Sequence, residues 1–196
     1  GSDEFTFQVS DGDLTDNASV SLYVNAVNDA PVLATLLDVS FDEDGTDSVT
    51  LTASDIDGDD LSYSVSTGTD IVATLDGTDL TFTAPSDFNG SENFTVSVTD
   101  GDLTDSQVLT VTINPVNDAP IATTGLTGET NEGVNISIQL SASDVDGDNL
   151  TYTLLSDATN GSITIEGQLA TYTPTDYYYG SDEFTFQVSD GDLTDN

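Results

Sequence analysis

The chain repeats itself with a period of about 90 residues, and this repeat limits its fold more than any other feature. The sequence GSDEFTFQVSDGDLTDN occurs at 1–17 and again, letter for letter, at 180–196. A looser copy, GSENFTVSVTDGDLTDS, begins at Gly90. A period of this length indicates one structural module that recurs along the chain.

The motif VNDAP occurs at 27–31 and again at 116–120, also one period apart. If this motif marks the joint between modules, the chain divides into three parts. We expect the C-terminal part of a preceding repeat at 1–27, a complete repeat at 28–117, and a repeat that lacks its last strand at 118–196.

Within the complete repeat, seven runs between 32–41 and 106–113 alternate apolar with small polar residues. Such alternation predicts half-buried β-strands, and the Gly- and Asp-rich clusters between the runs predict turns. Seven strands in about 90 residues predict an all-β fold of tandem seven-stranded Greek-key β-sandwiches, immunoglobulin-like in size and joined in a linear array. The side chains expected to face inward are Val49, Leu51, Ala53, Leu61, Tyr63, Val65, Leu80, Phe82, Phe94, Val96, Val98, Val108, Val111 and Ile113.

The composition excludes several functions. The chain has 37 acidic residues and no Lys, Arg or His, so its formal net charge is −37. Without cations it cannot neutralise phosphates, and we expect no binding to nucleic acid or to anionic membranes. No apolar run is long enough for membrane insertion. The unbalanced charge opposes compaction, so salt or bound cations must relieve it.

Catalysis is also restricted, because a chain without His or Cys has no Ser-His or Cys-His pair and no ordinary zinc site. Carboxylate pairs such as Asp42 with Glu43 leave a glycosidase formally open. That reaction needs a cleft and an acid of raised pKa, which solvated loops at the end of a sandwich do not offer. We therefore expect no enzymatic activity.

Whether a strand is odd- or even-numbered in its module, which we call its parity, predicts at which end, or pole, of the module the next loop lies. Strand parity therefore divides the acidic residues between the two poles of each module. If the strands alternate in direction, the loops after the second and sixth strands lie at the N-terminal pole, where the chain enters the module. This pole of the complete repeat is expected to gather Asn28, Asp29, Asp55, Asp57 and Asp100.

The C-terminal pole receives the acidic residues that precede the second and sixth strands. The next repeat adds its linker and its own loops there, so the predicted site comprises Glu43, Asp87, Asn117, Asp118, Asp144, Asp146 and Asp190. Calcium accepts six to eight oxygen ligands in irregular cages, whereas magnesium needs a strict octahedron. The sequence therefore predicts Ca²⁺ at these joints.

The Asp-rich loops have two other interpretations. The loop at 144–155 does not match the pattern of an EF-hand calcium loop, because Gly147 stands at position four of the loop and Leu155 replaces the bidentate Glu. As ordinary Asp-Gly turns they would hold no metal. Four further acidic residues are assigned to solvent or to positions behind the ligands, namely Asp59, Asp102, Asp105 and Asp148.

Three motifs resemble the cadherin-like tandem repeats of giant bacterial surface proteins. They are TASDIDGDDLSY, VSVTDGDLTDSQVLTVTINPVNDAP, and the EDG or NEG before the second strand, and together they cover essentially the whole chain. The resemblance implies a cadherin-like sandwich with calcium at the joints, held by the same residues that parity selects. The sequence departs from animal cadherins in its short NDAP linker and in Asn89, where a second carboxylate is usual.

These features predict a calcium-rigidified repeat region of an extracellular filament, stalk or adhesin at the cell surface, acting as a structural spacer. Calcium that binds only the assembled joint would stabilise it by RT ln(1 + [Ca]/Kd). The alternative is an adhesive module, homophilic or carbohydrate-recognising, in which Tyr177, Tyr178 and Tyr179 stack on sugar; rim aromatics are the simpler interpretation. The expected partners are calcium ions and neighbouring repeats or other copies of the chain. Two alternatives stay open: copies join head to tail by strand donation, or the chain is a stretch of a longer continuous fibre.

Overall fold

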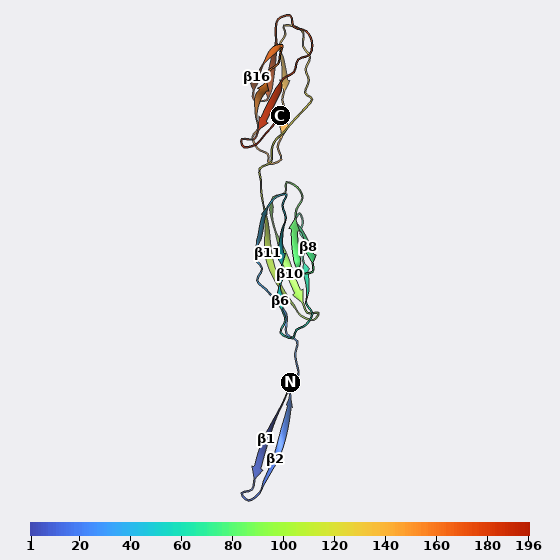
Figure 1. The fold of residues 1–196 in the computed structure, drawn as a ribbon, viewed down its shortest axis with the longest axis vertical. Coiled ribbons are helices and arrows are strands. Elements are labelled where there is room, and N and C mark those ends of the chain that lie inside the picture. The colour runs from blue at the N-terminus through green and yellow to red at the C-terminus, as the bar shows by residue number, and fades with distance from the viewer. The chain divides into compact units, whose positions relative to one another are not determined.

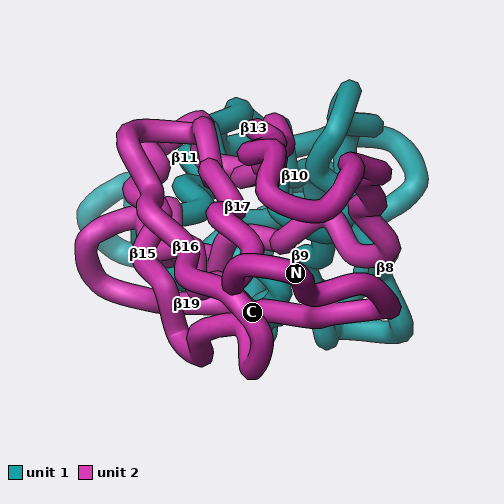
Figure 2. Tube along the Cα trace, turned by 90° about the horizontal axis from the view of Figure 1, so that it is seen from above, with its two compact units in different colours: residues 1–114 teal, residues 115–196 magenta.

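The computed structural model describes all 196 residues and consists of strands, turns and loops. It contains no helix, and therefore none that could cross a lipid bilayer. Two compact units divide the chain, Gly1–Asn114 and Pro115–Asn196 (Figure 2). The predicted all-β class is confirmed.

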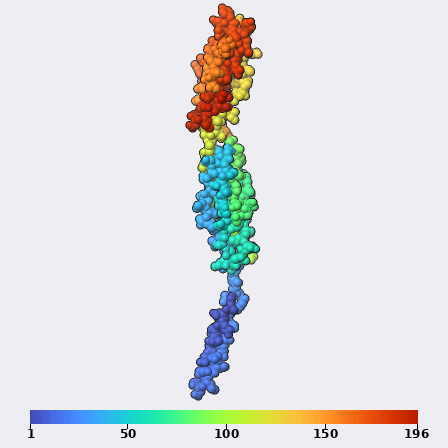
Figure 3. Space-filling model, in the orientation of Figure 1, coloured from blue at the N-terminus to red at the C-terminus, as the bar shows by residue number.

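Unit 1 begins with an isolated hairpin of β1 (Ser2–Ser10) and β2 (Thr15–Tyr23), shown in blue in Figure 1. The strands pair antiparallel from Ser2↔Tyr23 to Ser10↔Thr15 and join no other sheet. Every side chain of the hairpin strands is exposed except Val20, which is half-buried. The hairpin is thinner than the sandwich in Figure 3, because no second sheet packs against it.

The rest of unit 1 is a sandwich built from three sheets, in the orders β4-β11-β10-β7, β5-β9-β8 and β3-β6. All pairs are antiparallel except β4 with β11, which run parallel. The strands are β3 (Val32–Leu33), β4 (Val39–Asp42), β5 (Asp47–Thr50), β6 (Ala53–Ser54), β7 (Ser62–Val65), β8 (Val72–Asp76), β9 (Asp79–Thr83), β10 (Gly90–Thr99) and β11 (Thr104–Asn114).

The first and second predicted strands are each broken in two. The first leaves its pairing with β6 after β3 and joins β11 as β4. Side chains bridge the gap, since the Leu36 N–H donates to Gln107 Oε1 at 3.0 Å and the Thr110 N–H to Asp38 Oδ1 at 2.8 Å. The break therefore moves the first strand from one sheet to the other without leaving these backbone N–H groups unpaired.

Buried apolar residues from both larger sheets form the core of this sandwich. The rings of Phe82 and Phe94 meet at its centre with centroids 5.2 Å apart. The inward-facing residues predicted from the sequence are fully or partly buried here, with one exception. Val108 is 63% exposed, and the neighbouring Leu109 is 1% exposed. That prediction was wrong because Val108 lies on the opposite face of β11 from Val111, as the period of two requires.

Unit 2 has a similar but smaller arrangement, with sheets in the orders β13-β17-β16, β15-β18-β19 and β12-β14. Its buried core is Ala122, Leu140, Tyr152, Ala158, Ile163, Ala170 and Val188. Residues 128–131, one period after β4, form no strand. The strands are β12 (Ile121–Ala122), β13 (Ile136–Gln139), β14 (Ala142–Ser143), β15 (Thr151–Ser156), β16 (Gly161–Glu166), β17 (Leu169–Pro174), β18 (Thr185–Ser189) and β19 (Thr194–Asp195).

Candidate metal sites

A tight turn after β6 gathers three carboxylates at the N-terminal pole of the sandwich in unit 1. Asp55 Oδ1 accepts hydrogen bonds from the backbone N–H groups of Asp57 (2.8 Å), Gly58 (3.0 Å) and Asp59 (3.4 Å). Gly58 adopts φ +82°, which residues with a side chain rarely take. The turn brings one carboxylate oxygen each of Asp55, Asp57 and Asp59 within 4.8 Å of one another.

The linker and the loop after β10 close around this turn. The Asp29 N–H donates to Asp57 Oδ2 at 2.8 Å, and Asn28 Nδ2 donates to Asp100 Oδ2 at 3.0 Å. Asp100 Oδ1 in turn accepts from two N–H groups of its own loop at 2.7 Å each. The structure thus brings together all five residues that parity assigned to this pole.

Unit 2 builds the same arrangement one period later. Oxygens of Asp144, Asp146 and Asp148 lie within 4.8 Å of one another. The Asp118 N–H donates to Asp146 Oδ2 at 2.8 Å, and Asn117 Nδ2 to Asp190 Oδ2 at 3.0 Å. We refer to the two groups, Asp55 with Asp57 and Asp59, and Asp144 with Asp146 and Asp148, as the acidic triads.

The donor chemistry of the triads fits a hard cation. Asp55 Oδ2 and Asp144 Oδ2 are buried and have no hydrogen-bond partner. A buried polar atom left unpaired is costly, and the chain has no Lys, Arg or His to pair with it. Two oxygens that each lie about 2.3 to 2.6 Å from one Ca²⁺ can be up to roughly 5 Å apart, so the triad spacing suits calcium.

At each N-terminal pole the surroundings raise the pKa of one carboxylate and lower the pKa of another. Desolvation, followed by repulsion from Asp55, Asp57 and other nearby carboxylates, raises the pKa of Asp59. The same causes raise the pKa of Asp148 in unit 2. Hydrogen bonds from the Leu103 N–H and from Asn28 lower the pKa of Asp100. A cation in the triad would relieve the repulsion felt by Asp59 and Asp148.

Asp59 and Asp148 are the residues that the sequence interpretation left out of the sites. They continue the D-x-D spacing by one more step, as D-x-D-x-D at 55–59 and 144–148. The turn places these alternate positions on one side, so the third Asp of the spacing was the signal available. The sequence alone instead assigns both residues to solvent or to positions behind the ligands.

A family profile of the bacterial Ig domain matches residues 28–112 and 117–196. The chain belongs to the bacterial Ig domain family. No similar sequence was found among curated proteins. Domains of this family and of the cadherin-like fold are usually extracellular and are generally not enzymes.

Solved structures give the bacterial Ig domains of this chain a cadherin-like fold. The EC1-2 region of human protocadherin-24 (Form II) is 17% identical with a TM-score of 0.55, over 85% of this chain and 90% of that one. An endo-fucoidan hydrolase of glycoside hydrolase family 107, MfFcnA4, is 23% identical with a TM-score of 0.36, over 98% of this chain. The present chain spans only 32% of that hydrolase, so the likeness carries no inference about activity.

The C-terminal pole of the first bacterial Ig domain holds the other two predicted ligands of unit 1, Glu43 and Asp87. Glu43 is buried, with its N–H donating to the Asn114 carbonyl at 3.0 Å. The Asp87 N–H reaches Asp44 Oδ1 at 3.4 Å, which joins the loops before β5 and before β10. That Glu43 and Asp87 share an ion with residues of the next domain stays a prediction.

Proposed function

We propose that each acidic triad binds Ca²⁺ and that the chain is a calcium-rigidified repeat region of an extracellular filament, stalk or adhesin, acting as a spacer. The observation that carries the proposal is the buried, unpartnered carboxylate oxygen in each triad, Asp55 Oδ2 and Asp144 Oδ2. It recurs at the same point of two successive domains.

The residues that would hold the ion are the triad carboxylates, together with Asn28, Asp29 and Asp100 in the first domain and Asn117, Asp118 and Asp190 in the second. Bound calcium would supply the positive charge that these groups otherwise lack. Strand parity in the sequence adds Glu43 and Asp87 to the site of the following domain in this proposal. An ion that needs ligands from two domains stabilises their joined state by mass action.

Calcium titration of matched variants tests the metal site. Asp55→Asn with Asp144→Asn keeps the turn-forming oxygen and replaces the buried one with an amide. We expect at least a tenfold loss of calcium affinity by calorimetry, from a Kd of about 0.1 to 1 mM. Asp3→Asn with Asp16→Asn removes the same charge from exposed hairpin positions and should bind calcium normally. Equal affinity in both double variants would refute the triads as sites.

Small-angle scattering tests the spacer role. In millimolar calcium the chain should show a narrow range of dimensions, and chelator should broaden it, because the joints then become flexible. The Asp55→Asn, Asp144→Asn variant should resemble the chelated protein even with calcium present. Identical scattering with calcium and with chelator would remove the rigidifying mechanism.

A second candidate function is carbohydrate adhesion, favoured by Tyr177 and Tyr179, which are each 86% exposed. Aromatic rings with open faces are suitable platforms for apolar and stacking contacts. Saturable binding on a glycan array that is lost in Tyr177→Ser with Tyr179→Ser would support this function. Binding that is unaffected by that double variant would argue against it.

A further inference from the structure

Two Asn-Gly pairs occur in the chain, Asn89-Gly90 and Asn160-Gly161. In such a pair the backbone nitrogen of the glycine can attack the side-chain carbonyl carbon of the asparagine, because a glycine has no Cβ to hinder the approach and its backbone rotates freely. The reaction is intramolecular and needs no enzyme, so the geometry of each pair sets its rate. The surroundings of the two pairs differ sharply.

Asn89-Gly90 lies in the connection that leads into β10, at the C-terminal pole of the first bacterial Ig domain. Both residues are exposed, and Asn89 belongs to no strand. The Asn89 side chain makes no hydrogen bond. No contact therefore prevents this side chain from turning towards the Gly90 nitrogen.

Gly90 is the first residue of β10 and lies opposite Ile113 of β11, at the end of the ladder between these strands. The end of a ladder opens more readily than its middle, and an opening of one residue frees the Gly90 nitrogen. A Cβ built on Gly90 would meet only the ring of Phe88, at 3.3 Å. The backbone at Gly90 is thus not enclosed by the core of the domain.

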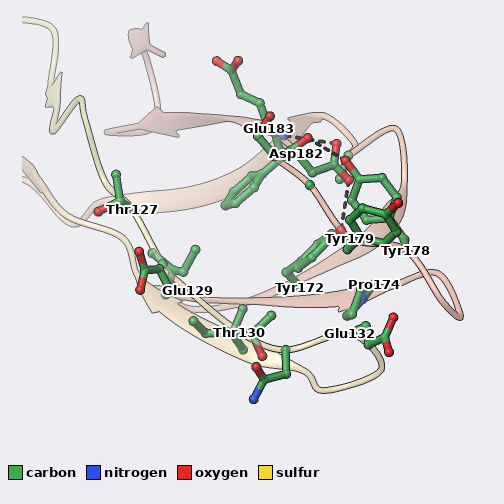
Figure 4. A pocket seen from close by; sticks show the side chains of 18 of the residues that line it. Thr127, Glu129, Thr130, Glu132, Tyr172, Pro174, Tyr178, Tyr179, Asp182 and Glu183 are labelled. Carbon is green, nitrogen blue, oxygen red and sulfur yellow. Dashed lines mark hydrogen bonds between the residues drawn. The ribbon is translucent and has the colours of Figure 1, made fainter.

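Asn160, in contrast, is held on both sides of its backbone. Its N–H donates to Asp182 Oδ2 at 2.8 Å, and its carbonyl accepts from the Thr175 N–H at 2.9 Å and from Tyr172 Oη at 3.2 Å. Tyr172 Oη also donates to Asp182 Oδ2 at 3.0 Å, and both residues line the pocket drawn in Figure 4. The ring of Tyr172 covers Gly161, where a Cβ would collide with it. Asn160 cannot rotate towards its glycine unless several of these contacts break.

We propose that Asn89 is a site of spontaneous deamidation in the folded protein and that the fold protects Asn160. The Gly90 nitrogen loses its proton and bonds to Cγ of Asn89, the side-chain nitrogen leaves as ammonia, and a five-membered succinimide ring results. Water then opens the ring at one of its two carbonyl groups. One opening gives aspartate, and the other gives isoaspartate, in which the main chain runs through Cβ and Cγ. In sum, one water is consumed and one ammonia is released.

Both products change the pole at which Asn89 lies. Each adds a negative charge near the buried Glu43 and near the loops that the hydrogen bond from the Asp87 N–H to Asp44 Oδ1 joins. The chain has no Lys or Arg to balance the new charge. Isoaspartate also lengthens the main chain by one CH₂ directly before β10, an inner strand of the four-stranded sheet. The modification therefore alters this pole progressively as the molecule ages.

Peptide mass spectrometry of the 196-residue protein tests the assignment. The folded protein is kept in mildly alkaline buffer, and samples are digested with pepsin in acid, which stops the reaction. The peptide with Asn89 should gain the mass difference between an amide and a carboxylic acid at least about ten times faster than the peptide with Asn160, because several hydrogen bonds hold Asn160. Equal rates for the two peptides in the folded protein would overturn the proposal.

The same incubation in urea separates the effect of the fold from that of the sequence. Both Asn-Gly pairs are followed by serine, at Ser91 and Ser162, so their local sequences are closely matched. In urea the two should react at similar rates, since neither is held. A preference for Asn89 that is as large in urea as in buffer would show that the fold does not protect Asn160. An Asn89 that reacts in urea and stays unmodified in the folded protein would equally contradict the assignment.

Matched variants identify the residue that carries the new charge. Asn89→Gln and Asn160→Gln each replace one asparagine with a glutamine, which must close a larger ring and therefore reacts slowly. Asn89→Gln should abolish the acidic species that anion-exchange chromatography detects first, and Asn160→Gln should leave it unchanged. An early acidic species that persists in Asn89→Gln would refute the site. Rates measured in chelator keep this outcome separate from that of the proposed calcium sites.

Discussion

Glu92 shows how a single carboxylate holds a loop in a chain that has no cationic side chain. Its two oxygens accept hydrogen bonds from the backbone N–H groups of Thr69 (2.8 Å), Asp70 (2.7 Å) and Ile71 (3.3 Å). These bonds lower the pKa of Glu92, the Asp70 N–H most strongly, against a smaller opposing effect of desolvation. In its ionised form, the Glu92 carboxylate therefore holds the loop between β7 and β8 in place.

Glu92→Gln should reduce the stability of unit 1 by about 1 to 2 kcal/mol at pH 7, because an amide cannot accept all three bonds. A lowered pKa contributes stability that is present above the unfolded pKa and is lost as pH falls through the folded pKa. The loss of stability caused by Glu92→Gln should therefore be smaller in acid. Urea unfolding at pH 7 and pH 3 measures it, with the exposed Glu4→Gln as control. A defect that is equally large at both pH values would contradict this role.

Asp59→Asn should have opposite effects with and without calcium. The raised pKa of Asp59 means that its ionised form destabilises the metal-free fold as pH rises through the folded pKa. In chelator at neutral pH the variant should melt at a higher temperature than the parent. In millimolar calcium it should gain less stability than the parent, because a ligand is lost.

Asp148→Asn should have the same two opposite effects on the stability of unit 2, since the same causes raise the pKa of Asp148. Thermal unfolding in the two buffers is the measurement. If the melting temperature changes in the same direction in chelator and in calcium, Asp59 and Asp148 are not ligands of the ion.

At the scale of elements, β11 supplies the covering layer of the complete sandwich. Leu109→Ala should cost about 2 to 4 kcal/mol, since the side chain is 1% exposed in a packed core. Val108→Ala, one residue away and 63% exposed, should change stability by no more than about 0.5 kcal/mol. Chemical denaturation distinguishes the two, and similar losses would mean that β11 does not hold this register in solution.

The sequence predicted the strands of the sandwich well, because alternation of apolar and polar residues is a local property. It did not predict the two breaks, which depend on contacts from distant residues such as Gln107 with Leu36. It also placed Val108 inward, since two adjacent apolar residues leave the parity of a strand ambiguous. The inward-facing residues expected from the sequence also omit Ile71, which is 1% exposed just before β8 and continues the alternation of Ala73 and Leu75.

The grouping of the candidate metal-site residues was predictable for a different reason. Strand parity fixes the pole of each loop, and this brought Asn28 beside Asp100 across 72 residues. The left-handed turn before β10 was not predictable. In unit 1 that turn has Asp87 at φ +57°, and in unit 2 the residue with this conformation is Tyr177, at φ +63°. The extra residue of the second repeat therefore places a tyrosine where the first repeat has a carboxylate.

At the scale of the whole molecule, a formal charge of −37 with no Lys or Arg sets the response to salt. Added NaCl screens repulsion among the carboxylates and disrupts no Lys or Arg ion pair. In chelator, raising NaCl from about 10 to 150 mM shortens the Debye length from about 30 to about 8 Å and should raise the melting temperature. A gain of about 1 kcal/mol corresponds to roughly 4 to 8 °C for a domain of this size.

Calorimetry at several salt concentrations measures this effect, and calcium at matched ionic strength should add a further increase. A melting temperature that falls with NaCl would contradict the view that repulsion among carboxylates dominates the electrostatics of the chain.

The parallel pairing of β4 with β11 has a mechanical consequence. These strands lie near the two ends of the complete domain and pair from Val111↔Val39 to Asn114↔Asp42. Tension applied through the two ends would pull the strands in opposite directions along their axes, so the hydrogen bonds between them would be sheared together instead of opening one at a time.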